Sequence, residues 1–146
     1  MLKQEVHFED IEEGMALPPM ARSATTTQLF LFSAATCNSH RVHYDKEYAA
    51  MEGHHDVLVH GPLQGAWLAQ YITTWMGPLG RLKKLEFSNR GRVFPGDLLL
   101  FKGRVVKKFT ENGEQLVVCD IWEEKESGEI TLPSKAVVSL PLRQPR

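Results

Sequence analysis

Apolar side chains occupy most positions between residues 63 and 76, a stretch that contains no Asp, Glu, Lys or Arg. Gly61-Pro62 precedes this stretch and Gly77-Pro78 follows it, and both dipeptides are typical of helix ends. A helix that is apolar on most faces has to be buried. We therefore predict a central helix over residues 63–76 in the interior of the fold, with Gly65 and Ala66 permitting close approach of a neighbouring backbone.

The pattern changes after Gly80 to alternating apolar and polar positions, which are typical of half-buried β-strands. Pro95-Gly96-Asp97 and Asn112-Gly113 are turn signals within this region. We predict an antiparallel meander, joined by a further strand near residues 20–24. The four strands of the meander are predicted at residues 82–93, 98–109, 115–123 and 130–140.

The first half of the chain predicts short helices and loops. The chain up to Pro18-Pro19 reads as an irregular arm. Thr25 is a candidate cap for a helix over residues 28–35, although the composition of this segment also permits a strand. Residues 37–44 read as an ordered loop, and Asp45 is a candidate cap for a helix over residues 46–52 that stops at Gly53.

Segregated helices and strands indicate an α+β fold in one domain, residues 1–146. The buried helix fits best in the concave face of a curled antiparallel sheet, which is the hotdog architecture. Such a sheet has an open edge that needs a cover. We therefore expect a second copy of the chain to pair with it, giving a homodimer or a higher homo-oligomer.

Composition and charge narrow the class of partner and the compartment. The chain has 17 Lys and Arg against 18 Asp and Glu, a net charge of −1, which argues against nucleic acid binding. No run of residues is long and apolar enough for a membrane span, and the acidic N-terminus does not resemble a signal peptide. Cys37 and Cys119 form no CxxC motif and read as buried small apolar residues, so a cytoplasmic location is expected.

Histidine is the residue type that points to a site. Five of the six histidines lie between residues 40 and 60, namely His40, His43, His54, His55 and His60. They stand beside the predicted start of the buried helix, whose free N–H groups and partial positive charge can stabilise a carbonyl oxygen that gains negative charge. Histidine titrates near neutral pH and can act as general base or acid. Zinc-ligand spacing is missing, so we expect no metal.

Three segments carry a resemblance to a known family. The segment Phe32-Ser33-Ala34-Ala35-Thr36-Cys37-Asn38-Ser39-His40-Arg41-Val42-His43-Tyr44-Asp45 resembles the hydratase motif of the MaoC-like, (R)-specific enoyl-thioester hydratases. Val59-His60-Gly61-Pro62-Leu63 resembles the start of that family's central helix, and Val93-Phe94-Pro95-Gly96-Asp97 resembles its strand turn. The resemblance implies a hotdog fold and reversible addition of water to a 2-enoyl thioester carried by CoA or acyl carrier protein, without a cofactor.

The resemblance also implies roles for single residues. His43 matches the catalytic histidine, and Gly61 matches the glycine whose N–H polarises the thioester carbonyl. Asn38 stands where most members have an aspartate, a variant that resembles the branch of mesaconyl-C4-CoA hydratases and mitochondrial-type 3-hydroxyacyl-thioester dehydratases. Asn38 cannot accept a proton and would orient water or substrate.

Substrate contacts are expected from His40, Arg41, His60, Arg90 and Arg92. The alternative for His60 is a helix-entry residue bonded to the backbone, and that interpretation is favoured. The alternative for the arginines, and for the basic run Arg81, Lys83 and Lys84, is a solvated surface. Trp67, Tyr71 and Trp75 recur every four residues and mainly predict core packing, with one of them lining an acyl channel.

Two other functions stay open. A hotdog thioesterase would need a carboxylate, and Asp45, Glu47 and Asp56 are the nearby candidates. A binding protein that retains the acyl pocket without catalysis would fit the change to Asn38. A dehydratase of the FabZ type is disfavoured, because its helix acid corresponds to Ala66.

Overall fold

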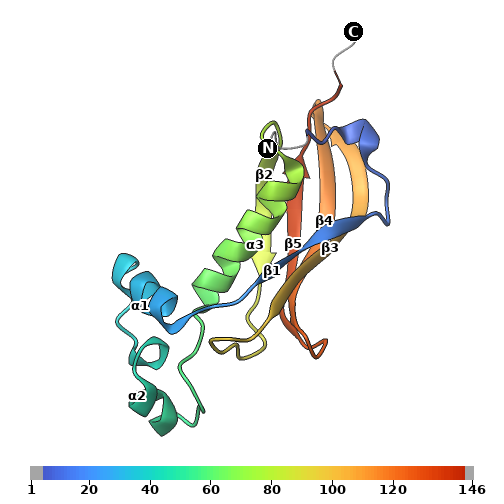
Figure 1. The fold of residues 1–146 in the computed structure, drawn as a ribbon. Coiled ribbons are helices and arrows are strands. Elements are labelled where there is room, and N and C mark those ends of the chain that lie inside the picture. Colours follow the sequence, from blue (N-terminus) through green and yellow to red (C-terminus); the bar gives the residue numbers. More distant parts are fainter. Residues whose placement is uncertain (1–4, 144–146) are drawn as a thin grey trace.

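The computed structural model describes residues 5–143. Five antiparallel strands form one sheet in the order β1-β3-β4-β5-β2, and helix α3 lies across it (Figure 1). The strands are β1 (Ala16–Arg22), β2 (Arg81–Phe87), β3 (Leu99–Glu111), β4 (Glu114–Lys125) and β5 (Ile130–Ser139). The predicted α+β class and the meander of β3, β4 and β5 are confirmed.

The position of β2 differs from the predicted meander. β2 pairs with β5, at the opposite edge of the sheet from β1, and it does not pair with β3. It is also shorter than predicted, because the chain leaves the ladder after Phe87. Backbone N–H groups of Ser88 and Arg90 then donate to carbonyls of Pro133 and Thr131 (3.3 and 2.9 Å), which ties residues 88–91 across the start of β5.

The first strand starts earlier than predicted. β1 begins at Ala16 and contains Pro18 and Pro19, so the irregular arm is shorter than the sequence indicated. Its pairing with β3 shifts register between Leu17 and Met20. Proline has no N–H to donate and is tolerated in an edge strand at such an irregularity, which explains how β1 accommodates both prolines.

Helix α3 (Gly61–Met76) is the predicted central helix, extended by two residues at its start. Leu68 and Ile72 are completely buried between the helix and the sheet. At Gly65 the close neighbour is a side chain and not the predicted backbone, since a Cβ there would lie 2.4 Å from the Phe87 ring. Ala66 instead faces solvent.

Two short helices precede α3 and lie away from the sheet (Figure 1). They are α1 (Thr26–Ala35) and α2 (Lys46–Met51), each with the predicted cap: Thr25 accepts from the N–H of Gln28 (3.1 Å) and Asp45 from that of Tyr48 (3.0 Å). Two 3-10 helices, η1 (Phe8–Asp10) and η2 (Arg41–His43), complete the described elements. None of the helices within residues 5–143 combines the length and apolarity that a membrane crossing requires.

Candidate active site

His43 lies at the end of η2 and is fixed by the connection that leads into α3. Its Nδ1 is 2.8 Å from the carbonyl oxygen of Leu58, and the N–H of Leu58 donates in turn to the carbonyl of Val42 (3.0 Å). Because a carbonyl can only accept, Nδ1 carries the ring proton and Nε2 keeps a free lone pair. Partial burial lowers the pKa of His43 below its ordinary value, so the ring is neutral at pH 7.

His60 is stacked on His43. The ring centroids are 3.8 Å apart and the planes meet at 21°. His60 is completely buried and precedes the first turn of α3, and its Nε2 is 2.7 Å from Ser33 Oγ on α1. Burial, together with neighbouring His43, lowers the pKa of His60 to about 4. His60 therefore stands at the start of the helix, as the favoured interpretation expected. Its hydrogen-bond partner is a serine hydroxyl and not the expected backbone group.

His40 also contacts His43, edge to face, with a centroid distance of 5.7 Å. Its Nε2 lies 3.4 Å from a carboxylate oxygen of Glu52, just beyond α2, and both side chains are partly open to solvent. His40, His43 and His60 therefore form one contiguous group, and the sequence spacing alone predicted only their proximity.

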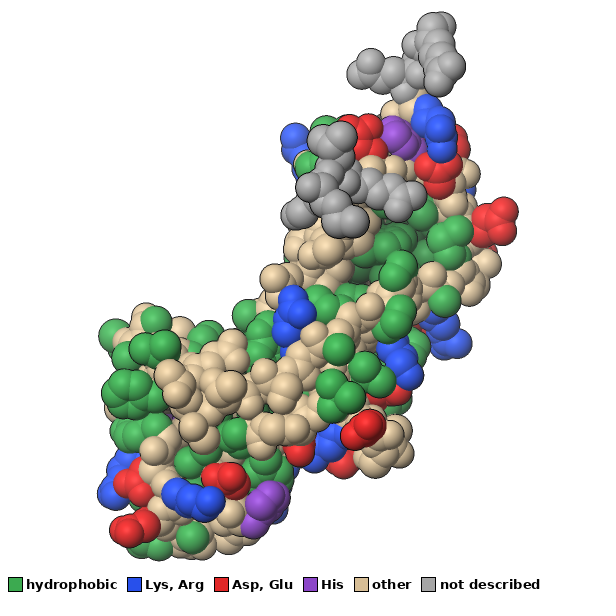
Figure 2. All heavy atoms as spheres, in the orientation of Figure 1, with side chains coloured by type: hydrophobic (Ala, Val, Ile, Leu, Met, Phe, Trp, Pro, Cys, Tyr) green, Lys and Arg blue, Asp and Glu red, His purple; other side chains and the backbone are tan. Residues whose placement is uncertain are grey.

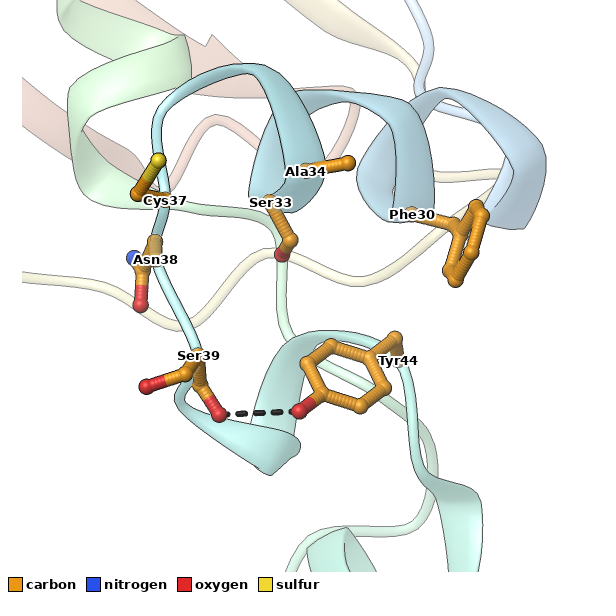
Figure 3. Close-up of a pocket in the computed structure, with 7 residues that line it drawn as sticks. All are labelled: Phe30, Ser33, Ala34, Cys37, Asn38, Ser39 and Tyr44. Carbon is orange, nitrogen blue, oxygen red and sulfur yellow. Dashed lines mark hydrogen bonds between the residues drawn. The ribbon is translucent and has the colours of Figure 1, made fainter.

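Asn38 and Ser33 line a cavity of about 480 Å³ between α1 and the loop that follows it. Figure 3 shows Ser33 pointing from α1 toward Tyr44, whose hydroxyl donates to the carbonyl of Ser39 (2.9 Å). The Oδ1 of Asn38 accepts from the backbone N–H of His40 (3.1 Å), so the amide oxygen shapes the loop. Its NH2 group is the part that can donate to a ligand. The cavity is lined by Phe30, Ser33, Ala34, Cys37, Asn38, Ser39 and Tyr44.

Gly61 is the first residue of α3, where N–H groups have no partner within the helix. The side-chain amide of Asn89 packs against it, and a Cβ at Gly61 would lie 2.0 Å from Asn89 Nδ2. This contact requires glycine at position 61 unless Asn89 moves. It also puts a polar amide beside the helix terminus that the resemblance assigns to the thioester carbonyl.

Arg41 extends along the outer surface of the loop. It forms an ion pair with Asp45 (2.6 Å), and its guanidinium lies 4.9 Å from the Tyr48 ring centroid. The Tyr48 N–H, followed by Arg41, holds the pKa of Asp45 below its ordinary value. Arg41 thus supports the loop that carries His43 while remaining exposed.

The remaining basic residues lie outside this cavity. Arg90 and Arg92 are exposed on the segment that follows β2. On β2, Lys83 pairs with Glu114 (2.9 Å) and Lys84 with Glu86 (2.7 Å), as expected of a solvated strand face. Arg81 is also exposed.

The burial of the cysteines and of the aromatic residues of α3 differs in part from the prediction. Cys37 is exposed, contrary to the prediction, because the chain turns there with a φ of 54° directly after α1; Cys119 is buried as predicted. Trp67 and Tyr71 are buried in the core. Trp75 is partly buried and, with Tyr71, borders a second cavity of about 790 Å³ near the far end of α3.

The structure therefore unites His40, His43, His60 and the start of α3, with Asn38 on the adjoining cavity. Sequence reasoning missed Ser33, Tyr44 and Asn89 as neighbours of this group. Ser33 and Tyr44 lie within the segment that carries the family resemblance, which was the available signal. Asn89 has no local signal, because its contact with Gly61 depends on the tertiary fold.

Comparison with known proteins first defines the class. The chain matches the solved structure of an R-hydratase from Pseudomonas aeruginosa with a TM-score of 0.85 and 24% sequence identity, over 95% of this chain and 88% of that one. This likeness, together with the sheet and its central helix, identifies the fold as the predicted hotdog fold.

Residues 11–95, more than half of the chain, match the family "Hydroxyacyl-thioester dehydratase type 2", and the chain belongs to this family. It is 44% identical over 61 residues to mesaconyl-C(4)-CoA hydratase of Chloroflexus aurantiacus, a match that covers 37% of this chain and 22% of that protein. It is 26% identical over 78 residues to the mitochondrial hydroxyacyl-thioester dehydratase type 2 of Saccharomyces cerevisiae, covering 53% and 27%. The matches thus span less than a third of either relative.

Proposed function

We propose that the protein is an acyl-thioester hydratase and dehydratase, which reversibly adds water to a 2-enoyl thioester to give a 3-hydroxyacyl thioester. The observation that carries the proposal is the state of His43. Its Nδ1–H is committed to the Leu58 carbonyl, so Nε2 of a neutral ring is available to accept a proton. Membership of the dehydratase family supports the reaction class.

The proposed reaction uses one base and one carbonyl donor. His43 Nε2 takes a proton from water while the water oxygen bonds to C3 of the substrate. The electrons of the C2–C3 double bond move toward the thioester, and the charge on its oxygen is stabilised by the Gly61 N–H at the start of α3. The imidazolium then gives its proton to C2, which restores neutral His43. Dehydration follows the same steps in reverse.

Asn38 is assigned the orientation of water or of the substrate hydroxyl. Its Oδ1 is occupied by the His40 N–H, which leaves the NH2 group to donate to an oxygen of the ligand. A carboxamide cannot take up a proton as a base, so His43 is the sole base in this proposal. Arg41, Arg90 and Arg92 are proposed to meet the carrier of the substrate through their exposed guanidinium groups.

The carboxylates required by the thioesterase alternative are largely engaged elsewhere. Asp45 caps α2 and pairs with Arg41, and Asp56 accepts from the Val57 N–H (2.8 Å) and lies 3.7 Å from Lys46 Nζ. No contact of Glu47 within the described residues directs it toward the histidines. None of these three carboxylates is thus directed toward the histidines by a contact within residues 5–143.

Association of two copies is part of the proposal. Both edge strands, β1 and β2, are open in the single chain, and Phe30 and Leu31 on α1 are 58% and 59% exposed. Figure 2 shows hydrophobic side chains gathered at the end of the molecule where α1 lies. A second copy would cover these surfaces and border the cavity beside α1. We place the proposed enzyme in the cytoplasm, in fatty acid metabolism or related acyl-thioester metabolism.

The test is incubation of the purified protein with crotonyl-, octenoyl- and mesaconyl-CoA while the enoyl-thioester absorbance and free thiol are followed together. We expect absorbance to fall without thiol release, at rates that rank the acyl groups. Release of thiol at the same rate as the absorbance change would contradict hydration and indicate a thioesterase. Lack of either signal with every substrate, while the acyl-CoAs bind, would instead support the non-catalytic binding protein.

A further inference from the structure

His60 has a position that a substrate contact does not explain. Its side chain is completely buried, so no ligand in the cavity can touch it without an opening of the fold. The ring is nevertheless held on three sides: by the Ser33 hydroxyl at 2.7 Å, by the edge-on Phe32 ring at 4.8 Å and by His43 stacked at 3.8 Å. Because His60 is buried and held against His43, any effect of His60 on the reaction has to act through His43.

We propose that His60 and Ser33 form a positioning pair, in which Ser33 fixes the His60 ring and His60 covers one face of His43 and holds its plane. The proposal rests on the assignment of His43 as the base of the hydratase. His43 is then located by two contacts of different kinds: the Leu58 carbonyl fixes its Nδ1 edge, and His60 fixes the tilt of the ring. Together they determine where Nε2 points.

The charge around His43 supports a covering role for His60. The titratable and charged groups that face His43 among the described residues are His40, His60 and, through His40, Glu52. His60 is uncharged at neutral pH, because its pKa is about 4, so it adds no positive charge beside the base. Its effect on His43 comes from excluding water, and burial is the main cause of the lowered pKa of His43.

Ser33 is the part of the pair that keeps His60 in place. Among the described residues its hydroxyl is the one hydrogen-bond partner of the His60 ring, because Nδ1 is buried without such a partner. The bond joins Ser33 on α1 to His60, the residue before α3, which lies 27 positions further along the sequence. Removal of the hydroxyl would leave both ring nitrogens of His60 unpaired, and the ring could then rotate off His43.

Three variants separate covering from hydrogen bonding: His60→Ala, His60→Phe combined with Ser33→Ala, and Ser33→Ala alone. The double variant retains a flat, buried ring over His43 and removes both polar partners. His55→Ala, at an exposed histidine beside Phe94, is the matched control. The readouts are the pKa of His43 from NMR titration of its ring protons and the acid limb of the pH–rate profile for hydration of the best enoyl-CoA.

We expect His60→Ala to raise the pKa of His43 by about half a unit or more and to move the acid limb upward by the same amount. The double variant should keep the wild-type pKa, Ser33→Ala should fall between the two, and His55→Ala should change neither readout. An unchanged His43 pKa in His60→Ala would overturn the proposal. So would a double variant that behaves like His60→Ala, because the ring nitrogens would then matter more than the cover.

The NMR titration does not depend on turnover, so the two proposals fail separately. A shifted His43 pKa in a protein that hydrates none of the enoyl-CoAs leaves the positioning pair intact and contradicts the hydratase. Hydration of an enoyl-CoA with an unchanged His43 pKa in all variants would support the hydratase and contradict the positioning pair. If His60→Ala does not fold, Ser33→Ala and the double variant still carry the comparison, because both retain a ring at position 60.

Discussion

His60 and Glu123 are two buried titratable side chains with closely parallel surroundings and different consequences. Each is completely buried, and within residues 5–143 each has a single side-chain hydrogen-bond partner, Ser33 for His60 (2.7 Å) and Thr131 for Glu123 (2.6 Å). Each also keeps one buried atom without a partner, His60 Nδ1 and Glu123 Oε2. His60 contacts the proposed base, whereas Glu123 lies on β4 within the sheet. Burial of a titratable group therefore does not by itself indicate a catalytic site. What distinguishes His60 from Glu123 is its contact with the proposed base.

The two residues also impose opposite pH dependences on stability. Burial lowers the pKa of His60 to about 4, so the folded state loses stability relative to the unfolded chain as the pH falls from about 6.5 toward 4. Burial raises the pKa of Glu123 to about 7. Its contribution is fully present below the ordinary value of 4.5 and is lost as the pH rises through 7, because the unfolded carboxyl ionises first. The two ranges overlap between about pH 4.5 and 6.5, so a rise in pH there strengthens the contribution of His60 while it weakens that of Glu123.

The largest expected effect is that of Glu123→Gln, which replaces the protonated acid with a neutral side chain of the same shape. Glutamine removes the cost of ionisation, so the variant should exceed the wild type in free energy of unfolding by roughly 3 kcal/mol at pH 8.5 and by little at pH 4.5. Urea unfolding at both pH values measures the difference. Hydration activity should not change, and parallel stability curves for the two proteins would remove Glu123 from the comparison.

Each of the two regions also contains a glycine in a close contact, Gly103 in the sheet and Gly61 at the start of α3. Gly103 lies inside β3, where a Cβ would be 2.7 Å from Ile121 and 3.1 Å from a backbone oxygen, so Gly103→Ala should cost about 1–3 kcal/mol of stability. Gly61→Ala has only the exposed end of Asn89 to displace. We expect near-normal unfolding with kcat/KM lowered about tenfold. Equal activity losses in the two folded variants would show that the helix start has no special role.

Loss of the α1 cap is expected to have a moderate effect on the histidine region. Thr25→Ala removes the bond to the Gln28 N–H and should destabilise the chain by about 1 kcal/mol. Because α1 carries Ser33, local opening should be detected by hydrogen exchange at α1 before the sheet. Thr26→Ala, which leaves the cap in place, is the control. Uniform faster exchange across α1 and the sheet would contradict a separately stabilised α1.

The smallest expected effect concerns the exposed arginines. Arg90→Ala should raise KM for an acyl-CoA about two- to fivefold without a change in unfolding, as befits a solvent-exposed charge contact with the carrier. Lys107→Ala, on the exposed face of β3, removes the same charge far along the sheet and is the control. Equal KM changes in the two variants would indicate a general charge effect.

Local features of this fold were predictable from sequence. The caps at Thr25 and Asp45, the Asn112-Gly113 turn and the buried character of α3 each depend on residues that are close together in the chain. The family resemblance directed attention to His43 and Gly61 for the same reason, since each lies in a short continuous motif.

Features that depend on distant pairing were not predictable. The sequence gives no reason for β2 to pair with β5 across the sheet, because either neighbour satisfies its alternation. The bond between Ser33 and His60 and the contact between Gly61 and Asn89 join segments more than 25 positions apart. The exposure of Cys37 follows from a left-handed turn whose direction a cysteine does not signal.

The most direct test of the account is the hydration rate of His43→Gln with the best enoyl-CoA, beside His55→Ala as control. Glutamine places its amide near the position of Nε2 but cannot take up a proton there, and it gives up the bond from Nδ1 to the Leu58 carbonyl. We expect a loss of at least about 100-fold in kcat, with urea unfolding showing a folded protein. Turnover within a few-fold of wild type in folded His43→Gln would contradict the central claim that His43 is the base.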